Sequence, residues 1–281
     1  MDFYKLFMKK TSGLLLSVLI ILLIFFTSSC SPKFYAPTTA QTPLFRQKGE
    51  TQISGHIGIG DEIDRSIQFQ AASAIYSHVA VFGTFYQAQK GFNIENPNDQ
   101  NNGKGSQLEL ALGYFNPITN IASYELYGGI AAGQLTNNFY RYYQHDSLGT
   151  RELPYLVKTN FIKPFIQGNI GTRSRLVDFI FNLRVAYLHI GKMTELNSHF
   201  PYTPAPNEYF DRIESTPHSI LIEPGFTLRL GFEPVKLQLH IAGSWNSNGE
   251  DYPQEKNVVS LGIVWMINSS SKKAKTSHLK F

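Results

Sequence analysis

Three side chains near the C-terminal end of the sequence have the types found in hydrolases: Ser244 as a nucleophile, His240 as a base and Glu223 as an acid. Apolar and polar residues alternate around His240 and Ser244, which indicates a β-strand. Four residues along a strand span about 13 Å, so His240 cannot hydrogen-bond Ser244 directly. The sequence also contains no G-x-S-x-G motif. We therefore do not expect an enzyme, and a lipid hydrolase is the third of the functional hypotheses considered below.

The histidines do not have the spacing of a metal site. The eight histidines occur without an H-x-H, H-x-x-x-H or H-E-x-x-H arrangement. They are better explained as solvated or packed side chains. We expect neither a metal site nor a cofactor.

Cys30, the only cysteine in the chain, follows a segment typical of a secretory signal. Residues 14–26 are apolar apart from one serine, and this run is shorter than the roughly 20 residues that a spanning helix needs. The basic residues Lys5, Lys9 and Lys10 precede the run. The small residues Thr27, Ser28 and Ser29 lie between the run and the cysteine. This order predicts a signal peptide over residues 1–29.

The Ser29-Cys30 pair resembles the lipobox of bacterial lipoproteins, although Thr27 stands where those proteins usually have leucine. The resemblance implies that Cys30 becomes the acylated, palmitate-bearing N-terminus of the mature chain. Ser31 stands where an aspartate would retain a lipoprotein in the inner membrane, so delivery to the outer membrane is implied. The alternative is a free cysteine after an ordinary signal peptide or an uncleaved anchor.

The composition excludes nucleic acid as a partner. The formal net charge is +4, but the basic excess lies in the signal and in a tail over residues 269–281 that carries four lysines. Aromatic residues make up 14% of the chain and charged residues only 16%, where a soluble domain ordinarily has about a quarter charged. This balance favours a chain with one face in lipid.

Apolar and polar residues alternate with period two through most of the mature chain. In "QLELALGYF", Leu108, Leu110 and Leu112 lie on one face, while Gln107 and Glu109 lie on the other. Ten such segments are predicted as strands, at about 51–60, 65–76, 79–88, 106–115, 123–134, 159–171, 176–190, 219–231, 235–246 and 257–267. Most have the length that a tilted strand needs to cross a bilayer.

The connections alternate between tight turns and long polar loops. The long ones are predicted at 89–105, 135–158, 191–218 and 247–256. An even number of strands with short turns on one rim and long loops on the other predicts an all-β, antiparallel transmembrane barrel of the outer-membrane type. A soluble two-sheet sandwich is the alternative. The expected organisation is a tether over 30–49 containing three prolines, a barrel over 50–268 and the polar tail over 269–281.

Charged residues fall on the polar face of the predicted strands, which points into the lumen of such a barrel. We expect a closed network of ion pairs there, formed by Glu109, Glu125, Lys163, Arg184, Glu223, Arg229 and Lys236. We also expect the loop 191–218 or the proline-containing tether to lie over one mouth.

Two predicted loops are rich in aromatic residues and form a candidate binding surface, since aromatic and arginine side chains dominate contact hot spots. Its members are Phe139, Tyr140, Arg141, Tyr142, Tyr143, Phe200, Tyr202, Tyr209 and Phe210. The alternative, which we favour, is that these loops fold over the lumen.

The mature chain resembles barrel lipoproteins common in Bacteroidota in its "Y-A-P…P-L-F…K-G-E" segment and its "E-P-G-F-T-L-R-L-G" strand. The resemblance implies fold and location but no activity. We predict a non-catalytic structural, binding or accessory component of the outer membrane, held in its lipid through Cys30 on the periplasmic side and able to contact an outer-membrane or periplasmic protein. The second hypothesis is a small-solute channel or a transporter of hydrophobic ligands, and the third is a barrel lipid hydrolase.

Overall fold

The computed structural model of the chain describes residues 35–61, 63–90, 102–197, 202–205, 208–249, 252 and 254–268. The predicted signal peptide, Cys30 and the tail over 269–281 lie outside the described residues.

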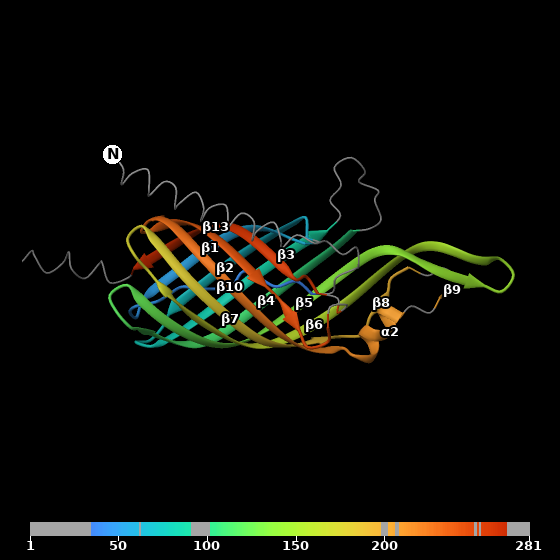
Figure 1. The fold of residues 1–281 in the computed structure, drawn as a ribbon, viewed down its shortest axis with the longest axis horizontal. Coiled ribbons are helices and arrows are strands. Elements are labelled where there is room, and N and C mark those ends of the chain that lie inside the picture. Colours follow the sequence, from blue (N-terminus) through green and yellow to red (C-terminus); the bar gives the residue numbers. More distant parts are fainter. Residues whose placement is uncertain are drawn as a thin grey trace, which may run out of the picture. The chain divides into compact units, whose positions relative to one another are not determined.

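Ten strands pair into a closed antiparallel barrel (Figure 1). They are β1 (Glu50–Gly60), β2 (Arg65–Ala74), β3 (Val79–Lys90), β4 (Asn102–Pro117), β5 (Ala122–His145), β6 (Gly149–Thr172), β7 (Val177–Ile190), β10 (His218–Phe232), β11 (Val235–Gly243) and β13 (Asn257–Asn268). Each strand pairs with the next, and β13 pairs with β1, so the sheet has no free edge around the barrel. The predicted ten-stranded barrel is confirmed.

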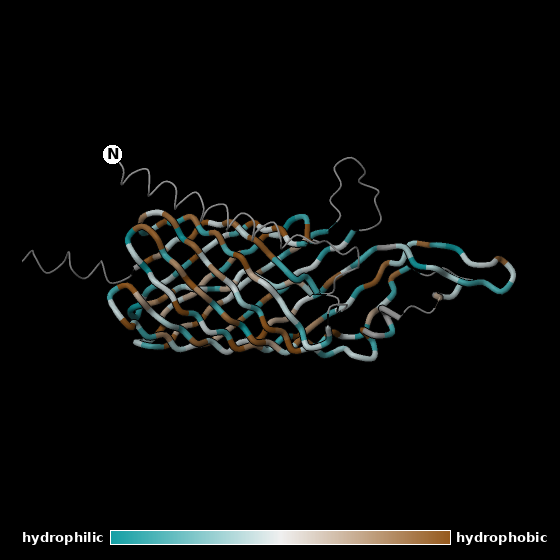
Figure 2. Tube along the Cα trace, viewed as in Figure 1, coloured by the Kyte–Doolittle hydropathy of each residue, from teal (hydrophilic) through white to brown (hydrophobic). Residues whose placement is uncertain are grey.

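The two faces of the strands differ in burial as the alternation predicts. In β4, Leu110 is 59% exposed, whereas its neighbour Glu109 is 0% exposed. Hydrophobic residues recur along the strands of the barrel wall, and the hairpin that β5 and β6 form beyond it is more hydrophilic (Figure 2). An apolar outer band around a polar interior is the arrangement of a barrel that spans a lipid bilayer. In the part of the chain described here, no helix is both long and apolar enough to cross a membrane.

The connections are sorted between the two ends of the barrel. Residues 75–78, 118–121, 173–176 and 233–234 form tight turns at one end, the short-turn rim. The other connections lie at the opposite end, the long-loop rim, and they include the short connection 61–64 and the longer one over 244–256. β1 begins and β13 ends at the short-turn rim, where Glu50 pairs with Asn268.

The predicted loop over 135–158 is wrong, because these residues continue β5 and β6. The two strands have 24 residues each and stay paired up to His145 and Gly149. Residues 139–155 extend past the ends of the neighbouring strands and are called the projecting hairpin (Figure 1). The aromatic and β-branched residues of this segment suit a strand, which its polar residues obscured.

The predicted loop over 191–218 also contains structure. It holds β8 (Thr194–Glu195), β9 (Thr203–Pro204) and α2 (Glu208–Ser215). β8 pairs with β6, and β9 pairs with β5 at Tyr143 and Gln144, close to the tip of the hairpin. The last short strand, β12 (Trp245–Asn246), pairs with β10.

The inside of the barrel is filled by side chains and by residues 35–46, which we call the luminal segment. Phe45 packs against Phe115 and Tyr35 against Phe161, with ring centroids 5.7 Å apart in each pair. Most of the luminal segment is buried. The described part of the tether therefore runs through the lumen, whereas the sequence analysis expected either the tether or the loop 191–218 over one mouth.

Candidate functional site: a filled lumen with a buried ion-pair network

The luminal segment crosses the barrel from one rim to the other. At the long-loop rim, Tyr35 pairs with Gln254, and its carbonyl accepts a hydrogen bond of 2.8 Å from the backbone N–H of Glu255. At the short-turn rim, the backbone N–H of Arg46 donates to Glu50 at 2.8 Å. The Arg46 guanidinium also bonds to the carbonyl of Arg173 in a turn of that rim. The segment thus enters at the long-loop rim and ends where β1 begins.

The barrel wall hydrogen-bonds the backbone of the luminal segment along its length. The side chain of Gln68 accepts from the N–H of Thr39 at 3.0 Å and donates to its carbonyl at 2.7 Å. Other wall side chains donate hydrogen bonds to backbone carbonyls of the segment: Gln70 to Thr39, Gln167 and Asn169 to Gln41, and Arg229 to Thr42. The backbone N–H of Phe45 donates to the side chain of Glu125. Buried backbone groups need such partners, so the polar wall residues provide what β-pairing provides elsewhere.

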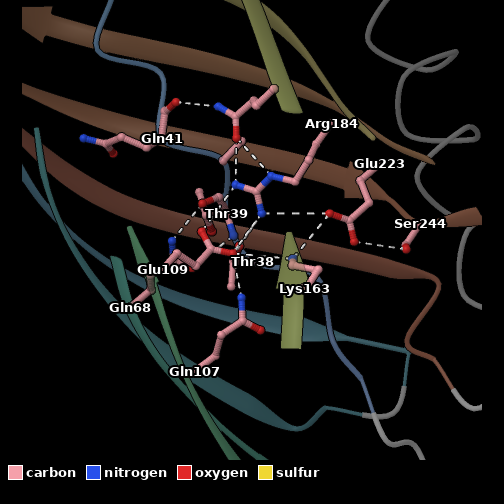
Figure 3. Close-up of polar contacts among 12 residues, drawn as sticks. Thr38, Thr39, Gln41, Gln68, Gln107, Glu109, Lys163, Arg184, Glu223 and Ser244 are labelled. Atoms are coloured by element: carbon pink, nitrogen blue, oxygen red, sulfur yellow. Dashed lines mark hydrogen bonds and ion pairs between the residues drawn. The ribbon is translucent and has the colours of Figure 1, made fainter. Parts of the chain in front are cut away.

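Four of the predicted luminal charges form one network in the middle of the barrel. Arg184 lies 2.9 Å from Glu109 and 3.9 Å from Glu223, and Lys163 lies 3.5 Å and 3.7 Å from the same two carboxylates. Figure 3 shows these four side chains pointing toward one another around the luminal segment. Two acids and two bases balance in charge, which is the condition for keeping buried ions.

The luminal segment takes part in this network. The phenol of Tyr35 accepts a hydrogen bond from Lys163 at 2.6 Å and donates one to Glu223 at 2.5 Å. The hydroxyl of Thr38 donates to Glu109 at 3.0 Å and accepts from Arg184 at 3.0 Å. Removing the segment would leave these wall charges without part of their hydrogen-bonding shell.

The other three predicted luminal charges are also buried, but they lie apart from the four-charge network. Lys236 pairs with Asp178 at 2.7 Å, a partner that we did not single out from the sequence. Glu125 accepts from Asn169 and from the backbone of the luminal segment, and Arg229 donates to Gln238 and to that backbone.

A second ion-pair cluster, which sequence reasoning missed, lies at the short-turn rim. Arg173 contacts Glu50 at 3.0 Å and Glu233 at 2.7 Å. Burial alone would raise the pKa of the Glu233 carboxyl, but the hydrogen bond and charge of Arg173 lower it below its ordinary value. These residues lie at strand ends and in turns, where the period-two pattern gives no information about neighbours.

The hydrolase candidates do not form a catalytic arrangement. Ser244 donates to Glu223 at 3.3 Å. His240 instead shares a 2.7 Å hydrogen bond with Thr227 and accepts from the backbone N–H of Ala40 at 3.4 Å. Among the residues that the structure describes, no group of three or more His, Cys, Asp or Glu could hold a metal ion.

The candidate binding surface is divided between two faces of the projecting hairpin. Arg141 donates to the carbonyl of Ala205 at 2.9 Å, and Tyr143 donates to Glu195 at 2.8 Å, so both hold the hairpin to residues 191–217. Tyr140 and Tyr142 point the other way and are 44% and 60% exposed.

The remaining members of that surface are only partly described. Tyr202 stacks at a tilt against His145, with ring centroids 5.4 Å apart. Tyr209 and Phe210 lie in α2, but their side chains, that of Phe139 and the whole of Phe200 are outside the described residues.

No family model matches the chain, and no curated protein matches it. Among solved structures, the outer membrane protease OmpT from Escherichia coli matches at 8% identity and a TM-score of 0.44, covering 82% of this chain and 97% of that one. The translocator domain of the autotransporter NalP from Neisseria meningitidis matches at 11% identity and a TM-score of 0.41, covering 77% and 86%.

LpxR from Salmonella typhimurium matches at 11% identity and a TM-score of 0.33, covering 76% of this chain and 99% of that one. The strand pairing of the chain itself identifies it as a closed, ten-stranded antiparallel β-barrel.

Proposed function

We propose that this chain is a non-catalytic outer-membrane barrel lipoprotein, a structural, binding or accessory component that holds its long-loop rim at the membrane surface. The observation that carries the proposal is the luminal segment, which occupies the barrel interior and is hydrogen-bonded to the wall. A chain of this kind uses its barrel as an anchor rather than as a path for solutes.

The size of the barrel and the chemistry of its interior support a closed lumen. Eight-stranded barrels are just wide enough for side chains or one small ligand, and open aqueous channels occur at 16 to 18 strands. Here ten strands enclose both their own inward side chains and the luminal segment. Opening a path would expose Glu109, Lys163, Arg184 and Glu223 to a new environment and break their contacts to Tyr35 and Thr38.

The proposal includes a lipid on Cys30. It is supported by the signal-like segment before this residue and by the absence of a second cysteine in the sequence. Metabolic labelling with a clickable palmitate is expected to mark the wild type and not Cys30→Ser. Labelling that persists in the serine variant would remove the lipid from the proposal.

The outer face of the projecting hairpin is the part proposed to contact a protein partner in the outer membrane. Tyr140 and Tyr142 are exposed on this face, and Leu148 at its tip is 53% exposed. Large aromatic side chains contribute strongly to contact hot spots. Their inward neighbours Arg141 and Tyr143 already hold the hairpin in place, so the side chains of the exposed pair can contact a partner.

The experiment that tests the closed lumen is recording in planar bilayers, with and without a cross-link that keeps the luminal segment in place. The hydroxyls of Thr39 and Ser260 are 2.7 Å apart, so Thr39→Cys/Ser260→Cys is suited to a disulfide. Thr39→Cys/Ser123→Cys is the control, because Ser123 lies at the short-turn end of β5.

Neither the wild type nor the cross-linked protein is expected to show steady conductance. Conductance in the wild type that disappears on cross-linking would identify the luminal segment as a gate and the protein as a channel. That result would overturn the proposal.

A further inference from the structure

We infer that the chain before Tyr35 leaves the barrel at the long-loop rim, so that the N-terminal end of the mature chain lies on the same side of the membrane as the projecting hairpin. This inference rests on the proposed outer-membrane location for its biological meaning, but its geometry rests on the luminal segment alone. It reverses the side on which the sequence placed the lipid-bearing end.

Contacts at the start of the luminal segment come from the long-loop rim. Tyr35 is held by Gln254 and Glu255, which belong to the connection between β11 and β13. Ala36 packs against the cluster of Ile63, Tyr86 and Ala88. Ile63 lies in the β1–β2 connection of that same rim. Two separate connections of the long-loop rim therefore surround the point of exit.

The other end of the luminal segment is held just as firmly at the short-turn rim. The backbone N–H of Gly49 donates to the carbonyl of Ala74 at 2.8 Å, at the end of β2. Arg46 binds Glu50 and the carbonyl of Arg173. Because both ends have their own partners, the direction of the chain through the lumen is set.

Chain length then determines where Cys30 can lie. Cys30 lies five positions before Tyr35, and a fully extended chain covers at most about 18 Å over those five steps. The apolar band of an outer-membrane barrel is about 25 Å tall. A chain that emerges at the long-loop rim therefore cannot return along the outside of the barrel to the short-turn side within five residues, and the lumen already holds residues 35–46.

A lipid on Cys30, as proposed above, is then held in the leaflet next to the long-loop rim. If the long loops face the exterior, this is the outer leaflet, and the protein is tied to the cell surface both by its barrel and by its acyl chains. The luminal segment must also be inside before the strands close around it, because acyl chains could not pass a filled lumen afterwards.

The test places one short epitope at three positions and asks which of them an antibody reaches on intact cells. The positions are the Ser31–Pro32 junction, the hairpin tip over 146–148 and the β4–β5 turn over 118–121. The epitope at Ser31–Pro32 is expected to react on intact cells like the one at the tip, while the one in the turn reacts only after permeabilisation. An N-terminal epitope that follows the turn instead would overturn the inference.

The same three positions separate this inference from the proposed function. If the turn is exposed and the tip hidden, the proposed orientation fails, and the inference still stands or falls by whether the N-terminal epitope follows the tip. If all three are hidden until lysis, the proposed location fails, and a second measurement on purified protein decides.

That measurement compares two cysteine pairs in a Cys30→Ser background, where only the introduced thiols are present. Ala36→Cys/Ile63→Cys is expected to form a disulfide, because Ala36 packs against the cluster that contains Ile63 at the long-loop rim. Ala36→Cys/Ala74→Cys is the matched control, with its second cysteine at the short-turn end of β2. A cross-link in the control pair alone would show that the segment runs the opposite way.

Discussion

Replacing Arg184 by methionine removes one of two bases from a buried cluster that also holds two acids. In the wild type, its guanidinium donates to Glu109 at 2.9 and 3.3 Å and to Gln167 at 3.0 and 2.7 Å. A fifth bond reaches Thr38 in the luminal segment. Methionine retains most of the apolar volume, so the change isolates the charge and its hydrogen bonds.

The expected loss of unfolding free energy is large, since Glu109 and Glu223 would share the single charge of Lys163. Removing one partner of a buried ion pair typically costs about 3–5 kcal/mol, because a charge is left uncompensated. Glu109→Gln/Arg184→Met restores a neutral cluster of one acid and one base. The double variant should therefore be more stable than the sum of the single losses predicts, by about 0.5–3 kcal/mol.

Urea unfolding of the barrel in lipid vesicles measures these differences, with folded and unfolded protein separated by their mobility on an unheated detergent gel. A single Arg184→Met variant whose unfolding free energy lies within about 1 kcal/mol of the wild-type value would contradict the reasoning, since a buried unpaired charge destabilises the folded state by more than that. Strictly additive single variants would also contradict it, because they would show that Arg184 and Glu109 do not interact.

Further changes test the wall and the rim. Leu110→Arg is expected to destabilise the barrel by about 2–4 kcal/mol if this exposed side chain faces mid-bilayer lipid, and unchanged urea unfolding would contradict the outward assignment. Gly129→Ala should destabilise the barrel, because a Cβ there would lie 2.6 Å from a backbone oxygen and from the Phe165 ring. Gly128→Ala is the control and should be nearly neutral, because there is open space around this glycine. Equal losses of stability in the two variants would contradict this prediction. Glu233→Gln should lower the stability of the barrel mainly above about pH 4.5, because Arg173 lowers the pKa of the Glu233 carboxyl. The stabilisation by this ion pair is lost as the pH falls through the lowered pKa. A stability difference between variant and wild type that does not depend on pH would count against the ion pair.

The barrel fold, and which side chains point inward or outward, were predictable from the sequence because both depend on local properties. In a strand, successive side chains point to opposite faces, so the run from Gln107 to Tyr114 already separates an outward apolar face from an inward polar one. Strand lengths and turns follow from the same alternation and its interruptions. One exception is the segment 139–155, where strand pairing continues through a polar sequence that resembles a loop.

The path of residues 35–46 could be decided only by the tertiary structure. This segment has no period, and its backbone is satisfied by Gln68, Gln167, Asn169 and Arg229, which are brought together only when the barrel closes. The pairing of the inward charges depends on the same closure. Glu109 and Arg184 are 75 residues apart and lie on strands that do not pair with each other.

The sequence alone therefore determined which residues point into the lumen, since facing repeats every second residue along each strand. Only the closed barrel decided that Glu109 and Glu223 share Lys163 and Arg184, and that Tyr35 reaches them from the long-loop rim. The physical reason is that a strand's facing is a property of its own backbone. Contacts across a lumen depend instead on strand order, register and whatever else the barrel encloses.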